Sequence, residues 1–247
     1  MLEIGRAVPI VAIALAGCHH GTIAVHDTIE ETRPLAADGT LDIGNTNGRI
    51  EIEAWDREEV WIEAERGAPS QRMLERIEVE IRGEGDRIEV RTHLPHGFLW
   101  GGAGQVEYRV KAPRGAALRI ESVNGPVRVL GADGDVRATT VNGSLEIEGA
   151  PDEVEASTVN GRIEASYESS AADGRHHFST TNGSVTIHLP PDVAGSFRAS
   201  TVNGGIDCDL PIPVEGKWNK QLDGRVGEGG GTYEVETVNG AVKIRQS

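Results

Sequence analysis

The sequence predicts an all-β protein, most of which is a single-stranded β-solenoid whose short strands wind into stacked coils. The 247 residues include 32 glycines but only 4% aromatic residues, a composition typical of many tight turns around an aliphatic core. An Asn-Gly pair recurs along the chain, and its copies start at Asn47, Asn124, Asn142, Asn160, Asn182, Asn203 and Asn239. From Asn124 to Asn160 the copies are 18 residues apart, and the later gaps are 22, 21 and 36 residues. A fixed period of about 20 residues is the signature of a repeat architecture.

Each 18-residue unit is predicted to contain two short strands and two turns. Inward positions are expected at the even residues from Val136 to Asn142, and after the turn at Leu145 and Ile147. This period of two is typical of a strand with one buried and one solvated face. Asn-Gly is therefore interpreted as a corner that resets which parity faces inward, and a second turn is expected midway, at Gly149–Asp152.

A meander of β-hairpins is the competing interpretation, because two-residue Asn-Gly loops are the strongest hairpin signal. In five copies, however, a Thr stands two residues before the Asn, and stacked coils would align such residues about 4.8 Å apart. We therefore expect ladders of these side chains along one corner of a solenoid. The expected corner ladder comprises Asn124, Asn142, Asn160, Asn182, Asn203, Asn239, Thr140, Thr158, Thr180, Thr201 and Thr237. The Gly after each Asn is expected to need φ > 0, which costs a β-branched residue about 1–2 kcal/mol.

Regular repeats are predicted over residues 116–247, and a less regular β region over residues 38–115, which includes Asn47. One helical turn is expected from Ser70, its N-cap, to Arg76. The 36-residue gap before Asn239 is interpreted as two units, in which a loop from Pro211 to Gly231 replaces one corner. Strands of the less regular region are predicted around Leu41–Ile43, Ile50–Ala54, Val60–Glu65, Ile77–Ile81 and Ile88–Val90.

The first residues are typical of a secretion signal. Arg6 precedes an apolar stretch, Ala7–Ala16, that is too short to span a bilayer and suits a signal peptide. The stretch ends in Leu15-Ala16-Gly17-Cys18, which resembles a bacterial lipobox. That resemblance implies a signal peptide over residues 1–17, lipid attachment at Cys18 and a lipidated tether over residues 18–37. An ordinary secretory signal, or a short membrane anchor that stays, remains the alternative.

Several motifs together resemble the bacterial "putative adhesin" family of β-strand-repeat proteins, over about residues 38–247. They are Trp55-Asp56, Pro113-Arg114-Gly115, the repeated Thr-Val-Asn-Gly, Val214–Trp218 and Glu236–Gly240. The resemblance implies a right-handed β-solenoid on the envelope side of a membrane, and it brings no established catalytic residues. The lipobox resemblance has a further implication, because His19 follows Cys18 where a retention Asp for the inner membrane would stand. It implies the outer membrane, facing the periplasm or the surface, if the cell is Gram-negative.

Charge and residue clusters exclude some function classes. A formal net charge of −15 repels phosphate backbones, so nucleic-acid binding is not expected. No ligand cluster suits a metal ion, and no cofactor motif is present. His176 and His177 are adjacent on one strand and should point to opposite faces. Cys208 is expected to be a small inward hydrophobe.

We therefore expect a non-catalytic envelope lipoprotein with an adhesive, scaffolding or sensing role, whose partners are the membrane and an unidentified envelope protein or polysaccharide. A polysaccharide-active enzyme is the alternative, with outward carboxylates such as Glu146 and Glu164 as its candidate site. A structural partner that docks through Phe98, Trp100 or Trp218 is the third hypothesis.

Overall fold

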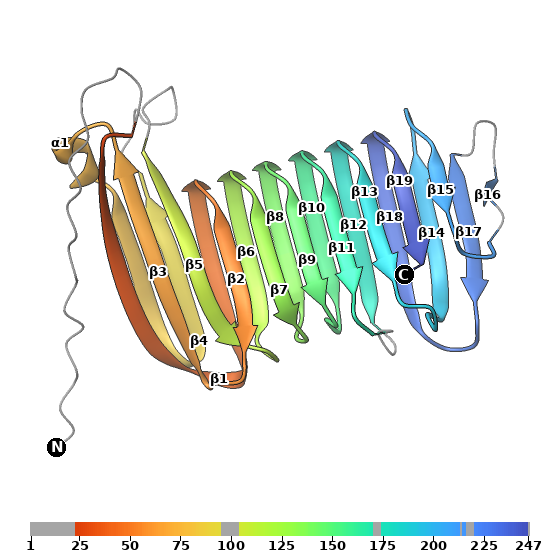
Figure 1. Ribbon diagram of the computed structural model, residues 1–247, viewed down its shortest axis with the longest axis horizontal. Coiled ribbons are helices and arrows are strands. Elements are labelled where there is room, and N and C mark those ends of the chain that lie inside the picture. The colour runs from red at the N-terminus through yellow and green to blue at the C-terminus, as the bar shows by residue number, and fades with distance from the viewer. Residues whose placement is uncertain (1–22, 95–103, 170–173, 213, 216–219, 247) are drawn as a thin grey trace.

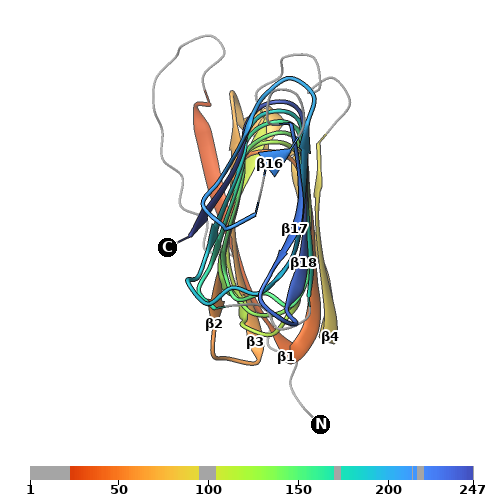
Figure 2. The same ribbon diagram turned by 90° about the vertical axis from the view of Figure 1, so that its right-hand side faces the viewer.

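The computed structural model describes residues 23–94, 104–169, 174–212, 214–215 and 220–246 (Figure 1). Its strands form two facing sheets, here called sheet A and sheet B, which run the length of the molecule. Viewed from the end, they enclose a flattened tube (Figure 2). The chain is therefore all-β, and the stack is broadly a β-solenoid, as predicted.

One strand, β1 (Val25–Asn47), belongs to both sheets, because its first part pairs in sheet A and its second part in sheet B. After β1, the spatial order in sheet A is β3 (Glu59–Ala68), β5 (Gln105–Pro113), β2 (Ile50–Trp55), β7 (Val127–Ala132), β9 (Leu145–Gly149), β11 (Ile163–Tyr167), β13 (Val185–Leu189), β19 (Val242–Gln246) and β15 (Ile206–Cys208). In sheet B the order is β4 (Glu78–His93), β1, β6 (Ala117–Asn124), β8 (Val136–Asn142), β10 (Val154–Asn160), β12 (Arg175–Asn182), β18 (Gly231–Asn239), β14 (Gly195–Thr201), β17 (Gln221–Val226) and β16 (Val214–Glu215).

The central coils confirm the predicted unit of two strands and two turns. β8 lies in sheet B, the Asn-Gly corner follows, β9 lies in sheet A, and a second turn leads to β10. Val136, Ala138 and Leu145 are buried between the sheets, so the parity resets at the corner as expected. Asn142 is exposed, contrary to the prediction, because the chain leaves the sheet at the corner and turns its side chain out.

The start of the fold differs from the predicted tether. Residues 25–37 belong to β1, where Val25–Pro34 pairs antiparallel with β3, so the lipidated tether predicted over 18–37 is wrong for this part. Asn47 also stacks in register on Asn124, and one hydrophobic core runs through both predicted regions. The sequence hid this pairing because four strands and one helix separate β1 from β6 along the chain.

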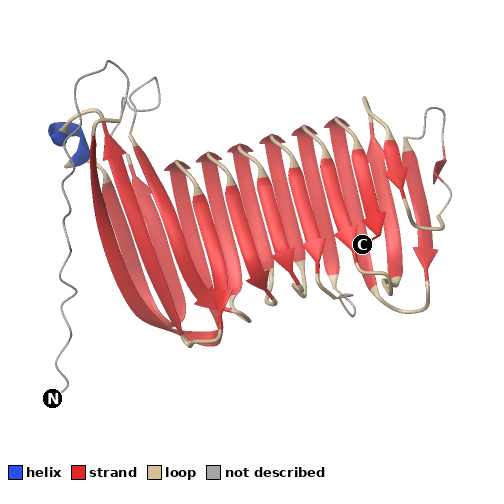
Figure 3. Ribbon diagram, viewed as in Figure 1, coloured by secondary structure: helices blue, strands red, loops and turns tan. Residues whose placement is uncertain are grey.

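Two smaller elements also differ from the prediction. The strands predicted on either side of Gly83–Asp86 form one element, β4, with positive φ at Gly83 and Gly85. His93 Nε2 lies 3.5 Å from a carboxylate oxygen of Glu80, so β4 reverses direction between these residues. The predicted helical turn is confirmed as α1 (Gln71–Leu74), the one helix among the described residues (Figure 3), but its N-cap, Ser70, makes no side-chain capping bond.

The last coil is not where the sequence order places it. β18 and β19 lie between the coil of β12 and β13 and the coil of β14 and β15, which precede them in sequence. The chain thus skips one place after β13, builds β14 to β17, and returns to fill the gap. The loop predicted from Pro211 to Gly231 contains β16 and β17, which pair antiparallel beyond β14, so the interpretation of the 36-residue gap as two units with one corner replaced by a loop is wrong.

Both ends of the stack contain antiparallel pairs, between β1, β3 and β5 at one end and between β14, β17 and β16 at the other. The structure is therefore a mixed stack and not a uniform single-stranded solenoid. The right-handed sense of coiling stays a prediction. Among the described residues, no helix is long and apolar enough to cross a bilayer.

Candidate functional site

Seven corner asparagines form one continuous side-chain ladder. In each step, Nδ2 of one Asn donates to Oδ1 of the Asn in the adjacent coil at 2.8–2.9 Å. The spatial order of the ladder is Asn47, Asn124, Asn142, Asn160, Asn182, Asn239 and Asn203. The predicted Asn ladder is thus present, and Asn47, which the sequence set apart, is its first member.

Most corner threonines donate to backbone carbonyl oxygens and not, as expected, to the side chains of a Thr ladder. Thr158 Oγ1 donates at 3.0 Å to the carbonyl oxygen of Gly143, in the adjacent corner. Thr180, Thr201 and Thr237 make the same bond at 2.9–3.0 Å. Thr140 Oγ1 is buried without a hydrogen-bond partner among the described residues. The Thr side chains therefore tie corner to corner through the backbone and do not bond to one another.

The corner glycines are required for a reason other than the expected positive φ. Only Gly48 and Gly125 among them have positive φ. A Cβ on Gly161 would lie 1.9 Å from the carbonyl oxygen of Gly143 in the preceding corner, and a Cβ on Gly183 would lie 1.8 Å from that of Gly161. Steric room between coils, and not backbone conformation, excludes a side chain at the central corners.

An exposed apolar row lies beside the ladder. The Val that precedes Asn is 39–59% exposed at Val123, Val141, Val159, Val202 and Val238. Sequence reasoning did not single out these residues, although the repeated Thr-Val-Asn-Gly carries them. They give the corner edge a straight row of methyl groups next to a row of amides.

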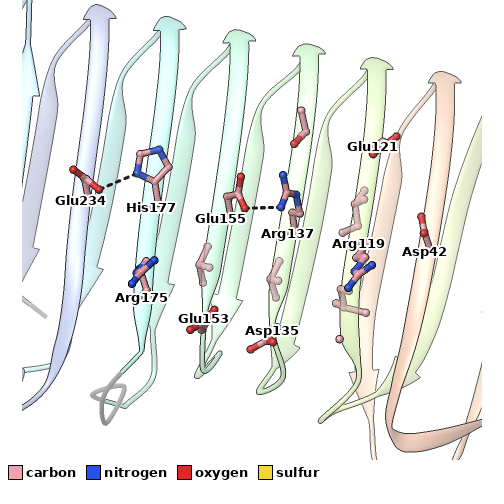
Figure 4. Close-up of a pocket in the computed structure, with 16 residues that line it drawn as sticks. Asp42, Arg119, Glu121, Asp135, Arg137, Glu153, Glu155, Arg175, His177 and Glu234 are labelled. Atoms are coloured by element: carbon pink, nitrogen blue, oxygen red, sulfur yellow. Dashed lines mark ion pairs between the residues drawn. The ribbon is translucent and has the colours of Figure 1, made fainter. Parts of the chain in front are cut away.

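The outer face of sheet B carries a shallow groove of about 810 Å³ that crosses β1, β6, β8, β10, β12 and β18 (Figure 4). Charged side chains stand along it in register, one from each strand: Asp42, Arg119, Arg137, Glu155, His177 and Glu234. We call this set the groove row. The short side chains of Ala117 and Thr139 also line the groove.

Ion pairs hold much of the groove row in place. Arg137 lies 2.9 Å from Glu155, and His177 lies 3.5 Å from Glu234 (Figure 4). Asp42 forms ion pairs with two arginines of β4, Arg91 at 2.9 Å and Arg87 at 2.6 Å. Arg119 is exposed and forms no ion pair with any residue that the structure describes. Six carboxylates and three arginines line the groove, so it is net acidic.

Sheet A presents a second charged face. The predicted column of Glu146 and Glu164 is confirmed by their register, and Arg128 lies 3.1 Å from Glu146. Burial raises the pKa of the Glu146 carboxyl; Arg128 opposes that shift, and the neighbouring carboxylates Glu148 and Glu164 add to it. Farther along the sheet, Arg245 pairs with Asp207 and Asp209. Arginines thus lie among the carboxylates on this face and pair with some of them.

A buried polar cluster lies between the sheets. His176 is fully buried, whereas His177 faces the groove, which confirms that the two point to opposite faces. The Tyr167 hydroxyl lies 2.9 Å from His176 Nδ1, and the Tyr233 ring stacks on the imidazole with centroids 4.6 Å apart. Nε2 of His176 has no partner among the described residues. Burial lowers the pKa of His176 to about 4.

Cys208 is half-buried against the core, less enclosed than the inward position predicted, because β15 is the last strand of sheet A. Burial raises the pKa of its thiol, which therefore stays protonated and unreactive at neutral pH. Within the described ranges, no three His, Cys, Asp or Glu side chains are grouped to hold a metal ion. The predicted signal peptide (1–17), Cys18, Phe98, Trp100 and Trp218 lie outside the described residues.

The groove row was missed by sequence reasoning, which weighed outward carboxylates only on strands that follow a corner. The same alternation places outward charges on the strands before each corner, at Arg119, Arg137 and Glu155. That signal was present in the sequence. What it could not show was that six such strands lie side by side.

Comparison with known proteins relates the chain to a family and a fold. The family model Toastrack DUF4097 matches residues 109–245. No curated protein sequence matches the chain. A structure of a "putative cell adhesion protein" from Clostridium sporogenes ATCC 15579 is similar with a TM-score of 0.52 and 14% identity, over 90% of this chain and 100% of that one.

Two further structures are less similar. A "putative adhesin" from Bacteroides fragilis NCTC 9343 has a TM-score of 0.35 and 11% identity, over 88% of this chain and 97% of that one. Another from Parabacteroides merdae ATCC 43184 has a TM-score of 0.33 and 11% identity, over 90% and 96% of the two chains. At these identities the first likeness shows the fold alone, and the other two carry no argument.

Proposed function

We propose, given that this chain belongs to the Toastrack DUF4097 family, that it is a non-catalytic recognition module anchored by lipid in the cell envelope. Its ligand is an extended polar polymer, and a polysaccharide of the envelope is the class that fits. The ligand lies along the groove on sheet B. Similarity to a "putative cell adhesion protein" is compatible with this role.

The observation that carries the proposal is the groove row. Six strands each contribute one charged side chain in register, so donors and acceptors recur about every 4.8 Å along the solenoid axis. A ligand that uses this pattern must be long and must cross the strands. Arginine and carboxylate groups offer charge-assisted hydrogen bonds to hydroxyl, amide or ammonium groups of such a chain.

The surplus of carboxylates in the groove predicts which polymers bind most tightly. A polymer that carries amino groups should bind best, a neutral one more weakly, and a polyanion not at all. Titration calorimetry of the soluble Cys18→Ser chain with chitosan oligosaccharide, dextran and alginate tests this order. Binding should weaken as salt rises, because exposed charges are screened.

A matched pair of variants locates the site. Arg137→Glu with Glu155→Arg reverses one pair of the groove row, and Arg128→Glu with Glu146→Arg reverses a comparable pair on sheet A. We expect the first to reduce binding at least fivefold and the second to leave it unchanged. Equal effects of both, or binding of alginate in preference to chitosan, would contradict the groove as the binding face.

The lipid anchor is a separate part of the proposal and rests on the Leu15-Ala16-Gly17-Cys18 motif. Acylation of Cys18 would hold the module at a membrane surface, in the outer membrane if the cell is Gram-negative. Growth with radioactive palmitate should label the full-length chain and not the Cys18→Ser variant. Label retained in the variant would refute attachment at this residue.

A polysaccharide-active enzyme on sheet A is the second candidate, favoured by the raised pKa of Glu146 and its register with Glu164. Carboxyl groups about 5 Å apart are the arrangement of retaining glycosidases. Release of reducing ends from envelope polysaccharide, abolished by Glu146→Gln, would establish this candidate. Loss of a cross-linked protein partner on Trp100→Ala or Trp218→Ala would instead support docking.

A further inference from the structure

The place that β18 and β19 occupy is a gap that the rest of the chain leaves open. The segment 190–194 connects β13 to β14 and skips one coil position, so two coils that follow each other in sequence are not neighbours in space. We call residues 231–246 the closing coil. Without the closing coil, four strands would have unpaired edges in the middle of the stack: β12 and β14 in sheet B, and β13 and β15 in sheet A.

The closing coil fits this gap by the same interactions as any other coil. On one side Asn239 donates to Asn182, and on the other Asn203 donates to Asn239, each at 2.8 Å. Thr237 donates to Gly183, and Thr201 donates to Gly240. Its inward side chains, such as Tyr233 and Ile244, are buried in the common core. The gap thus accepts a coil that carries the corner motif, and the closing coil fills it on both sides.

The connection to the closing coil is built as a hinge. Residues 227–230 run from β17 past Ala194 to β18, and Gly227, Gly229 and Gly230 all have positive φ. A Cβ on Gly230 would lie 2.0 Å from the carbonyl oxygen of Ala194, so the crossing needs glycine there.

We propose that the gap also accepts the closing coil of a second copy, so that two chains exchange residues 231–246. Exchange of identical elements is a low-cost route to dimers, because every contact of the monomer is remade between chains. Exposed strand edges in the empty gap favour pairing with a coil that matches their register, and the closing coil of a second copy is such a coil. Insertion of a chain's own closing coil is intramolecular and does not depend on concentration, whereas exchange between chains does. A high local density of chains at a membrane surface therefore shifts the balance towards exchange. This inference concerns self-association and does not depend on the proposed ligand.

The test uses two differently tagged copies of the chain, each with Cys18→Ser and Cys208→Ser. One copy carries Thr186→Cys on β13 and the other Lys243→Cys on β19, which are register partners on the outer face of sheet A. Parallel register partners are close enough for a disulfide. The copies are mixed, incubated at high concentration or refolded together from urea, and oxidised. We expect a disulfide between chains that peptide mapping assigns to positions 186 and 243.

A matched pair of copies provides the control. Glu146→Cys in one copy and Glu164→Cys in the other are also register partners on sheet A, but they belong to successive coils. The 186–243 product should exceed the 146–164 product at least tenfold. The double variant Thr186→Cys/Lys243→Cys in one chain should close internally and stop the exchange. Equal yields from the two mixtures, or a double variant that does not close, would overturn the proposal.

Discussion

Asn239 donates a hydrogen bond from Nδ2 to Oδ1 of Asn182 at 2.8 Å, although 57 residues separate them in the sequence. The next Asn along the chain from Asn182 is Asn203, and it bonds instead to Asn239. A single row of amides therefore records the spatial order of the coils and shows that the last one is inserted. The ladder is a consequence of stacking, because in-register strands place the corner Asn of each coil directly beside the corner Asn of the next coil.

The Asn ladder should contribute to stability at interior positions more than at its end. Asn160→Ala removes one hydrogen bond donated to Asn142 and one accepted from Asn182. The expected loss is about 1 kcal/mol in the free energy of unfolding, since solvent competes at this exposed edge. Urea unfolding of the soluble chain measures it. Asn203→Ala, at the end of the ladder, removes only the bond to Asn239 and should cost about half as much; equal losses would contradict the ladder as a stabilising unit.

Glycine at a central corner should be irreplaceable for steric reasons. Gly161→Ala brings a Cβ to 1.9 Å from the carbonyl oxygen of Gly143, so neighbouring coils must separate. We expect destabilisation of at least about 2 kcal/mol, as for other overpacked sites. Gly205→Ala is the control, because a Cβ there meets nothing within 4 Å. Thermal unfolding that shifts equally in both variants would rule out the collision as the cause.

The cost of replacing a buried corner threonine by valine should depend on whether its hydroxyl has a hydrogen-bond partner. Thr158→Val removes the bond to the Gly143 carbonyl and leaves that oxygen without its side-chain donor, so it should cost about 1 kcal/mol. Thr140 has no partner, and Thr140→Val should be neutral or stabilising, because a methyl group replaces an unsatisfied hydroxyl of the same shape. The comparison needs only urea midpoints. A larger loss for Thr140→Val than for Thr158→Val would refute this account.

Acid should destabilise the fold through His176. Burial lowers its pKa from 6.5 to about 4, so below pH 6.5 the unfolded chain takes up a proton that the folded chain does not. Stability therefore falls as the pH falls from 6.5 towards 4, by on the order of 3 kcal/mol, and this contribution is constant below pH 4. Unfolding measured by denaturant at pH 7, 6, 5 and 4 should show this slope above the background of the carboxylates.

Two variants separate His176 from that background. His176→Phe with Tyr167→Phe replaces both partners of the buried hydrogen bond by apolar rings, and it should flatten the dependence between pH 6.5 and pH 4. Thr140→Val changes no titratable group and should leave the slope unchanged. An unchanged slope in the double variant would mean that another group controls the acid response.

Much of the fold was predictable because the repeated motif fixes local geometry. The parity switch between Thr140 and Leu145 followed from alternation alone, and the Asn ladder followed from equal spacing. Within the site, the outward position of Glu146 and Glu164 was predicted, whereas the groove row was not. The reason is that Arg119, Arg137 and Glu155 form one surface only after sheet B has assembled.

The sequence by itself determined the repeating unit: two strands, a corner at each Asn-Gly, and an inward face of aliphatic residues. These are properties of residues within about 20 positions of one another, and sterics and period-two burial decide them locally. Only the tertiary structure decided which coil lies beside which. Every coil presents the same strand edges in the same register. The local sequence pattern therefore cannot show that Asn239 lies beside Asn182, or that Asn47 lies beside Asn124. The length and path of the connections settled that order, through the segment 190–194 that skips one place and the glycines at 227–230 that let the chain return to fill it.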